Sequence, residues 1–289
     1  MEEVRLQATR PIGVLDSGVG GLTVVKELMR QMPYESIVYI GDSARCPYGS
    51  RPKADIRQFT MEMVHFLLSF SPKLIVIACN TATAVALEDV RRNISIPVIG
   101  VVEPGARAAI REGAPDQPIG VIGTEATITS GVYEETLKRT QPDLTVKSVA
   151  TPELVPLVEM MWPEEAAYPV VKKALEPILK EPVGTLVLGC THYPLLAPLI
   201  QKAVGEKVTL ISSARETANE VARVLSERDL LAPTDESPYI RLFTTGDDIS
   251  FRLIASRWLE REDLDIATTT LVGSLSYLSG DLRIHEVQG

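Results

Sequence analysis

The chain has 289 residues, 45% hydrophobic and 23% charged, enough to bury the core of one large domain or two modest ones. Its formal net charge of −9 disfavours a nucleic-acid groove, because phosphate binding needs clustered Lys and Arg and the basic residues here are scattered. We expect a cytoplasmic protein, since the sequence holds neither a membrane-spanning apolar run nor the apolar segment of a signal peptide. Three cysteines in so long a chain form no disulfide framework and are expected to be free thiols.

Short apolar runs alternate with helical patterns along the chain, which predicts βαβ units and a parallel sheet covered on both faces. The predicted strands lie at residues 12–15, 37–40, 74–78, 98–102, 119–122, 144–149, 186–188 and 208–211. The clearest helix is predicted over residues 54–70, where apolar residues recur at helical spacing. We therefore predict an α/β fold with mainly parallel sheets flanked by helices.

Two segments of the sequence recur at nearly the same offset. The segment PIGVLDSGVGG at Pro11 resembles PIGVIGTEATI at Pro118, 107 residues later. The segment LIVIACNTATA at Leu74 resembles TLVLGCTHYPL at Thr185, 111 residues later. These repeats indicate duplicated halves related by a pseudo-twofold axis. Because ligands of open parallel sheets bind beyond the carboxyl ends of the strands, we expect the active site in a cleft between the halves.

Cys79 and Cys190 occupy matched positions in the second pair of repeats, each directly after an apolar strand. The N-terminus of the helix that follows Cys79 is expected to lower the thiol pKa from about 8.5 and to supply a thiolate near pH 7. The alternative for Cys79 is a small buried hydrophobic residue at a strand end, which is what most free cysteines are. Two such placements favour a pair of thiols that face one cleft.

His192 lies two residues after Cys190, in a turn of sequence GCTHYP. A histidine in this place could orient or deprotonate the thiol. A Cys-x-His metal site is the alternative, but His65 and His285 look like helix and tail residues and complete no second ligand pair. We therefore expect no metal.

Asp16 and Ser17 follow the first predicted strand and precede a glycine-rich turn. The turn has neither GxGxxG in the required register nor a Gly-Lys-Ser/Thr sequence, so a nucleotide site is disfavoured. Its glycines let the backbone approach a small ligand, and the following helix N-terminus favours an anion such as a carboxylate. The alternative is a purely structural role, in which Asp16 or Ser17 caps the following helix, and both interpretations can hold together.

A loop punctuated by proline and glycine follows the second predicted strand at residues 42–49. It lies at the same end of the sheet and could close over the cleft. Arg45 and Arg51 could bind a substrate carboxylate there, although exposed arginines without such a role are common. Cys46 lacks the strand-end placement of the other cysteines and is predicted to be incidental.

Together these motifs resemble those of the glutamate racemase family. The resemblance rests on LDSGVGGLTV, CPYG, ACNTATA, LVPLVE and GCTHYPLL, and it continues in the FTTGD segment at Phe243, so it spans most of the chain. It implies two α/β domains with the active site between them and a C-terminal segment that returns to the first domain. On this basis we expect a first domain of residues 1–102 plus 213–289 and a second domain of residues 103–212.

The resemblance also implies an enzyme that interconverts L- and D-glutamate without a cofactor and supplies D-glutamate for peptidoglycan. In the implied two-base mechanism Cys79 removes the Cα proton of D-glutamate, Cys190 removes that of L-glutamate, and the opposite thiol delivers a proton. Asp16, Glu159 and His192 would tune the thiols or hold the substrate ammonium group. The implied substrate contacts are Asp16, Ser17, Tyr48, Gly49, Asn80, Thr81, Thr191 and His192.

Other interpretations stay open at the level of the sequence. A racemase of the same superfamily that acts on aspartate or a hydantoin would share the paired cysteines. A non-catalytic carboxylate-binding protein would share the scaffold, and a redox pair would join Cys79 to Cys190 in a disulfide, which requires Cα atoms within about 7 Å. The sequence predicts a small-molecule partner, and the resemblance allows a homodimer, although no segment identifies an interface.

Overall fold

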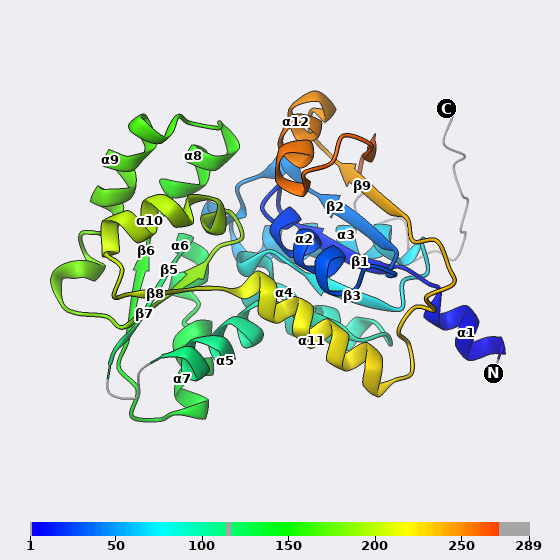
Figure 1. Ribbon diagram of the computed structural model, residues 1–289, viewed down its shortest axis with the longest axis horizontal. Helices are drawn as coiled ribbons and strands as arrows, with labels where there is room; N and C mark the ends of the chain where they lie inside the picture. Colours follow the sequence, from blue (N-terminus) through cyan, green and yellow to red (C-terminus); the bar gives the residue numbers. More distant parts are fainter. Residues whose placement is uncertain (1, 114–116, 272–289) are drawn as a thin grey trace.

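The computed structural model describes residues 2–113 and 117–271 and shows two lobes side by side (Figure 1). One lobe is built on a six-stranded sheet and the other on a four-stranded sheet. Helices flank both sheets (Figure 1). This architecture confirms the predicted α/β fold with two halves.

The first sheet has six parallel strands in the order β10-β9-β2-β1-β3-β4. Its strands are β1 (Ile12–Asp16), β2 (Ile37–Gly41), β3 (Leu74–Ile77), β4 (Val98–Gly100), β9 (Ile240–Thr244) and β10 (Asp265–Thr268). Ile12 pairs with both Ile37 and Leu74, so the three central strands begin level with one another. Since all the strands are parallel, their carboxyl ends lie along one edge of the sheet.

The second sheet has four parallel strands in the order β6-β5-β7-β8. Its strands are β5 (Ile119–Gly123), β6 (Val146–Ala150), β7 (Thr185–Gly189) and β8 (Thr209–Ser212). Strands β5–β8 have the same spatial order as β1–β4 of the first sheet. The first strand of each set, β1 or β5, lies between the second and the third, and the fourth lies beyond the third. This shared order confirms the duplication that the sequence repeats predict.

Helices cover both faces of the first sheet. Since successive residues of a strand point to opposite faces, neighbouring residues pack against different helices. Val14 belongs to a buried core with side chains of α2, α11 and α12, whereas Leu15 belongs to a core with side chains of α3 and α4. The helix predicted over residues 54–70 is α3. The helices of this lobe are α1 (Glu2–Ala8), α2 (Leu22–Gln31), α3 (Lys53–Leu68), α4 (Asn80–Asn93), α11 (Ser213–Glu227) and α12 (Asp248–Leu259), with 3₁₀ turns η1 (Ser43–Arg45) and η2 (Tyr48–Ser50).

The second sheet is covered in the same way. Val187 belongs to a core with side chains of α5 and α7, and Leu188 to a core with side chains of α8, α9 and α10. The helices here are α5 (Val102–Glu112), α6 (Glu125–Thr129), α7 (Val132–Thr140), α8 (Leu154–Glu159), α9 (Glu164–Leu175) and α10 (Ala197–Val204), with 3₁₀ turns η3 (Ile178–Lys180) and η4 (Tyr193–Leu196). Among the described residues, no helix has the length and apolar character that crossing a membrane requires.

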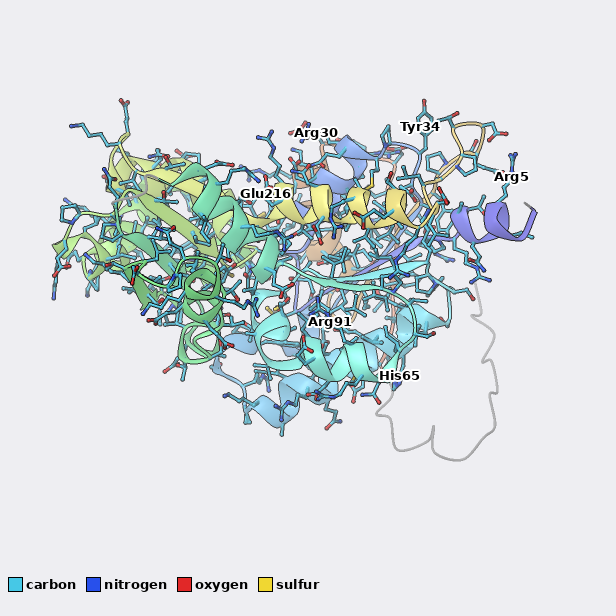
Figure 2. The ribbon with its side chains drawn as sticks, turned by 90° about the horizontal axis from the view of Figure 1, so that it is seen from below. Arg5, Arg30, Tyr34, His65, Arg91 and Glu216 are labelled. Atoms are coloured by element: carbon cyan, nitrogen blue, oxygen red, sulfur yellow. The ribbon has the colours of Figure 1, made fainter. Side chains whose placement is uncertain are left out.

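Helix α11 carries the chain from the second lobe back to the first. It follows β8 of the second sheet, yet its buried residues Ala218, Val221 and Leu225 belong to the core of the first lobe. It also contacts α5, where Glu216 pairs with Arg111 at 3.0 Å. Figure 2 shows Glu216 at the end of α11 that is nearer the second lobe.

The observed strands match the predicted ones to within a few residues, with three corrections. The sequence patterns miss β9 and β10, which are partly exposed and contain Arg241 and Asp265 in place of a continuous apolar run. Val102 is not in a strand, because it begins α5. The strand predicted at residues 144–149 begins only at Val146.

We propose that the chain divides into residues 1–102 plus 213–289 and residues 103–212, as the resemblance implies. The packing of α11 on the first sheet and of α5 on the second supports these limits. Residues 272–289 of the first unit lie outside the described residues.

Candidate active site

A small cavity lies beyond the carboxyl ends of β3 and β7, and both strand-end thiols line it. Its volume is about 10 Å³, which is about the room that one water molecule needs. A substrate of several heavy atoms therefore enters only when the walls move apart. A larger hollow of about 290 Å³ beside Trp258 has no thiol or imidazole in its wall. The residues that line the small cavity are Ser17, Cys46, Pro47, Tyr48, Gly49, Cys79, Asn80, Thr81, Thr124, Val155, Cys190, Thr191 and His192.

Cys79 follows β3 and caps the N-terminus of α4. Its sulfur accepts the backbone N–H of Ala82 at 3.4 Å and lies 3.4 Å from the hydroxyl of Ser17. The residue is only 5% exposed. The predicted place of this thiol at a strand end and a helix start is confirmed.

The pKa of Cys79 contradicts the expectation from the helix N-terminus, because it is raised to about 12. Burial is the largest cause, since water no longer solvates the thiolate, and the charge of Asp16 adds to it. The hydrogen bonds with Ser17 and with the amide of Ala82 lower the pKa but do not outweigh these effects. The prediction of a Cys79 thiolate near pH 7 is therefore wrong for the closed cavity, where Cys79 is a thiol.

Cys190 follows β7 and has a different set of neighbours. Its sulfur lies 3.6 Å from Nδ1 of His192. The opposite ring nitrogen, Nε2, lies 2.6 Å from Oε1 of Glu159, the last residue of α8. The side chain of His192 is 3% exposed and that of Glu159 is 26% exposed. The imidazole thus bridges a buried thiol and a carboxylate at the edge of the site.

The pKa values of His192 and Glu159 move apart. Burial is the largest influence on His192 and would lower its pKa, but its hydrogen bonds and charge interactions with Cys190 and Glu159 raise that pKa well above its ordinary value. Burial would raise the pKa of Glu159, but the hydrogen bond and charge of His192 bring it below its ordinary value. At neutral pH the pair is therefore imidazolium and carboxylate, with positive charge beside the Cys190 sulfur.

Asp16 ends β1 and is fully buried. Its carboxylate accepts the hydroxyl of Thr191 at 3.2 Å and the backbone N–H of Gly18 at 3.0 Å. Burial raises the pKa of Asp16, while the charge of His192 and these hydrogen bonds oppose the rise. Asp16 therefore joins the glycine-rich turn of the first lobe to the residue that follows Cys190 in the second.

Two glycines allow the lobes to approach each other at the cavity. A Cβ atom on Gly20 would lie 2.4 Å from Oγ1 of Thr191 and 2.6 Å from Nδ1 of His192. A Cβ atom on Gly49 would lie 2.6 Å from Cβ of Thr124. Only glycine fits such close approaches. The helix α2 that follows the glycine-rich turn has no side-chain cap, so the capping alternative for that turn is not supported.

Asn80 and Thr81 begin α4 and contact the second lobe. Oδ1 of Asn80 accepts the hydroxyl of Tyr133 at 2.6 Å. The Thr81 hydroxyl lies 2.8 Å from that of Thr124 and 3.3 Å from that of Thr127. These contacts join α4 of the first lobe to α6 and α7 of the second.

The loop of residues 42–49 closes one side of the cavity. Tyr48 is buried there, and its hydroxyl donates to Asp42. Nε of Arg45 donates to Asp42 at 2.6 Å, and its Nη1 donates to a second carboxylate at 2.5 Å. Arg51 is exposed and donates to a backbone carbonyl. Neither guanidinium lines the cavity, so the structure does not support the carboxylate-clamp role for either arginine.

Cys46 lies closer to the site than its sequence context predicts, since it lines the cavity with its sulfur 3.6 Å from Oε1 of Glu159. Cys46, Glu159 and His192 each bring one potential metal ligand within 4.8 Å of the others. Burial, with the charge of Glu159 next, raises the pKa of the Cys46 thiol, and the pKa of His192 is raised as well. Because metal ligands must lose their protons, this cluster favours hydrogen bonding, and the expected lack of a metal stays a prediction.

Every substrate contact implied by the resemblance lines the cavity except Asp16. Asp16 and Glu159 lie one hydrogen bond behind it. The sequence interpretation misses Thr124 and Val155, although the repeat itself aligns Thr124 with Ser17 and could have identified it. All three cysteines are free thiols, so the structure gives no support to a disulfide between the two strand-end cysteines.

Comparison with known proteins agrees with the geometry. Residues 12–221 match the profile of the family described as Asp/Glu/Hydantoin racemase. A glutamate racemase from Carnobacterium sp. (strain St2) is 50% identical over 263 residues, which cover 90% of this chain and 98% of that protein. The crystal structure of a glutamate racemase isoform from Bacillus anthracis is 50% identical, with a TM-score of 0.87 and coverage of 90% of this chain and 97% of that one.

A third comparison adds a bound ligand. The crystal structure of glutamate racemase from Francisella tularensis in complex with D-glutamate is 34% identical, with a TM-score of 0.84. It covers 91% of this chain and 98% of that one. The chain belongs to the Asp/Glu/Hydantoin racemase family, as the resemblance of its motifs predicts.

Proposed function

We infer that this protein interconverts L- and D-glutamate and thereby supplies D-glutamate for peptidoglycan. The observation that carries the inference is the single cavity shared by Cys79 and Cys190, two buried thiols at matched strand ends of the two sheets. Proteins named glutamate racemase that are 50% identical to this chain over 90% of its length support the choice of substrate.

Inversion at Cα needs a base on one face of the substrate and an acid on the other. One thiolate takes the Cα proton and becomes a thiol, and the electron pair stays on the substrate as a carbanion. The opposite thiol then gives its proton to the other face of Cα and becomes a thiolate. The proton count of the substrate is unchanged, so the reaction balances without a cofactor. We assign removal of the proton of L-glutamate to Cys190 and of D-glutamate to Cys79.

The two protonation environments support a defined starting state. The imidazolium of His192 lies beside the Cys190 sulfur, where a positive charge suits a base. Burial and Asp16 keep the proton on Cys79. The closed cavity therefore suits L-glutamate, with Cys190 as the base and Cys79 as the acid. The reverse reaction starts from the opposite state, in which Cys190 holds the one proton of the pair and Cys79 is the thiolate.

Polar groups on the cavity wall suit a small dicarboxylate with an ammonium group. We propose that Ser17, Asn80, Thr81 and Thr191 donate to the substrate carboxylates and stabilise the charge that develops on the carbanion. Tyr48 and Gly49 bound the cavity from the loop of residues 42–49. Asp16 and Glu159 supply negative charge for the ammonium group and for the imidazolium of His192. The cytoplasmic location and a homodimer stay predictions.

A substrate panel tests this proposal. The L and D enantiomers of glutamate and aspartate, together with a hydantoin, are incubated with the wild type and with Cys79→Ser, and the products are separated by chiral chromatography. We expect inversion of both glutamate enantiomers by the wild type alone. Exclusive turnover of aspartate or the hydantoin would contradict the choice of substrate. Binding of glutamate without turnover would favour the non-catalytic carboxylate-binding alternative.

A further inference from the structure

The amide of Asn80 is held from across the cleft by one side chain. Its Oδ1 accepts the hydroxyl of Tyr133 at 2.6 Å. Its Nδ2 is buried and has no hydrogen-bond partner within residues 2–113 and 117–271. Asn80 is 2% exposed, lines the cavity and directly follows Cys79. One end of this amide is therefore fixed, and the other is a buried donor pair beside a catalytic thiol.

The hydroxyl of Tyr133 determines which end of the amide is free. The two ends of an amide have nearly the same shape, so hydrogen bonds decide which end meets a given neighbour. Burial raises the pKa of Tyr133, so the phenol keeps its proton and needs an acceptor. Oδ1 of Asn80 is that acceptor. Turning the amide over would bring the hydroxyl proton against an N–H₂ group.

Tyr133 is itself rigidly anchored in the second lobe. It lies near the start of α7, is 2% exposed and belongs to the core between α5, α7 and the second sheet. A Cβ atom on Gly189 would lie 3.2 Å from Cε2 of the tyrosine ring, so the ring packs closely against the end of β7. Its hydroxyl reaches across to Asn80 of the first lobe. Tyr133 does not line the cavity.

We propose that Tyr133 is a positioning residue, which holds the Asn80 amide with its N–H₂ group toward the cavity to donate to a substrate carboxylate beside Cys79. The inference rests on the proposed function, because glutamate supplies that carboxylate. A buried donor without a partner is unfavourable and gains most when an anion accepts it. Since Tyr133 and Asn80 belong to different lobes, this donor is oriented only when the cleft is closed.

A double-mutant cycle tests the role of Tyr133. The steady-state kcat and KM of both glutamate enantiomers are measured for the wild type, Tyr133→Phe, Asn80→Ala and the double variant. We expect Tyr133→Phe to raise KM about tenfold with a smaller change in kcat, and to change KM less than about twofold in the Asn80→Ala background, where no amide remains to be positioned. Multiplicative effects of the two substitutions would overturn the inference.

Two further variants exclude a merely structural effect. Tyr193 is a matched control, because it is a buried tyrosine outside the cavity wall whose hydroxyl donates to the carbonyl of Thr151 at 2.7 Å. Tyr193→Phe should lower the unfolding temperature about as much as Tyr133→Phe and leave KM within about twofold. A KM as high as that of Tyr133→Phe would show that the loss of any buried hydroxyl suffices, against the proposal.

Asn80→Asp keeps the acceptor for Tyr133 and places an oxygen where the N–H₂ group lies. Its KM should rise at least as much as that of Asn80→Ala, because the new oxygen repels the substrate carboxylate. An unchanged KM would show that the donor does not face the substrate. A wild type that leaves glutamate unchanged would refute the proposed function and this inference with it. If the wild type is active and the KM changes of Tyr133→Phe and Asn80→Ala multiply in the double variant, only the role of Tyr133 is refuted.

Discussion

The two thiols of the cavity follow equivalent strands in sheets of the same strand order, yet they have different neighbours. Cys79 contacts neutral groups, the hydroxyl of Ser17 and the amide of Ala82. Cys190 contacts an imidazole that a carboxylate holds in its charged form. The two sulfurs thus occupy equivalent positions of the duplicated halves, but the described residues around them place a positive charge beside Cys190 and none in contact with Cys79.

This difference teaches how a nearly symmetric reaction can begin from an asymmetric site. In the closed cavity the proton is held on Cys79, and the positive charge of His192 lies beside Cys190. L- and D-glutamate have equal free energies in water, so the ratio of kcat/KM in the two directions is fixed. A substitution on either side must therefore change both kcat/KM values by the same factor. The asymmetry therefore appears in protonation states, in isotope effects and in the separate kcat and KM values, but not in the ratio of the two kcat/KM values.

The largest expected effect concerns the pH dependence of Cys79 alkylation. Its pKa of about 12 means that the thiolate fraction rises through the whole neutral range. Between pH 6 and 9 its alkylation rate should rise about a thousandfold without a plateau, since the thiolate fraction changes about tenfold per pH unit below the pKa. Mass spectrometry of cysteine-containing peptides measures this rate. A plateau near pH 8.5 would mean that burial and Asp16 do not hold the proton.

His192→Asn should lower kcat/KM of both enantiomers about a hundredfold, because the Cys190 thiolate loses its cation. Proton transfer between Cys190 and Cα then limits the rate in both directions. With Cα-deuterated substrates, the isotope effect on kcat/KM should be larger for L-glutamate, whose deuterium Cys190 removes, than for D-glutamate. The opposite order would reverse the assignment of the two cysteines.

Glu159→Gln should lower kcat/KM about tenfold, since a charged hydrogen-bond partner of His192 contributes roughly 1.5–3 kcal/mol, the neutral amide oxygen keeps part of that hydrogen bond, and about 1.4 kcal/mol corresponds to a factor of ten. The smaller effect is expected because Glu159 acts through His192. An effect larger than that of His192→Asn would show that Glu159 contacts the substrate or Cys190 independently. Steady-state kinetics of the two variants side by side decide the order.

The same pair predicts a pH dependence of stability. Because folding raises the pKa of His192, its protonation stabilises the folded protein. This stability is fully present below the pKa of the unfolded state and is lost as the pH rises through the pKa of the folded state. Because folding lowers the pKa of Glu159, its ionisation also stabilises the folded protein. This stability is fully present above the pKa of the unfolded state and is lost as the pH falls through the pKa of the folded state. The difference in unfolding free energy between wild type and Glu159→Gln should therefore peak between about pH 4.5 and 6.5. A flat difference across this range would contradict the ion pair.

Cys46→Ala should have the smallest effect, a change in kcat/KM below about threefold, because a thiol is a weak hydrogen-bond donor to Glu159. Cys46→Ser is the matched control, since it keeps a donor of similar size. A loss comparable to that of His192→Asn would make Cys46 a third functional thiol of the site.

Most of the fold and the centre of the site follow from the sequence, for local reasons. Buried parallel strands read as short apolar runs, so the central strands are predicted, whereas the partly exposed β9 and β10 are missed. Cys79 and Cys190 are predicted because the place after a strand is fixed by the chain itself. The repeat at offset 107 pairs Ser17 with Thr124, but composition alone does not mark Thr124.

The remaining features depend on how the two lobes pack. The contact of Cys46 with Glu159 and that of Tyr133 with Asn80 each join residues of different lobes, so no local pattern predicts them. The pKa of Cys79 is misjudged because the helix N-terminus is visible in the sequence, whereas the depth of burial of the thiol, which outweighs it, is not.

Hydrogen exchange during a single turnover tests the pair of thiols most directly. L- or D-glutamate is incubated in D₂O with wild type, Cys79→Ser and Cys190→Ser, and Cα deuterium is measured in product and residual substrate at low conversion. We expect deuterium in the product of the wild type, protium in its residual substrate, and a loss of about a thousandfold or more in each variant. Rapid deuterium uptake into the residual substrate of the wild type, or full activity of either variant, would contradict two thiols acting on opposite faces of Cα.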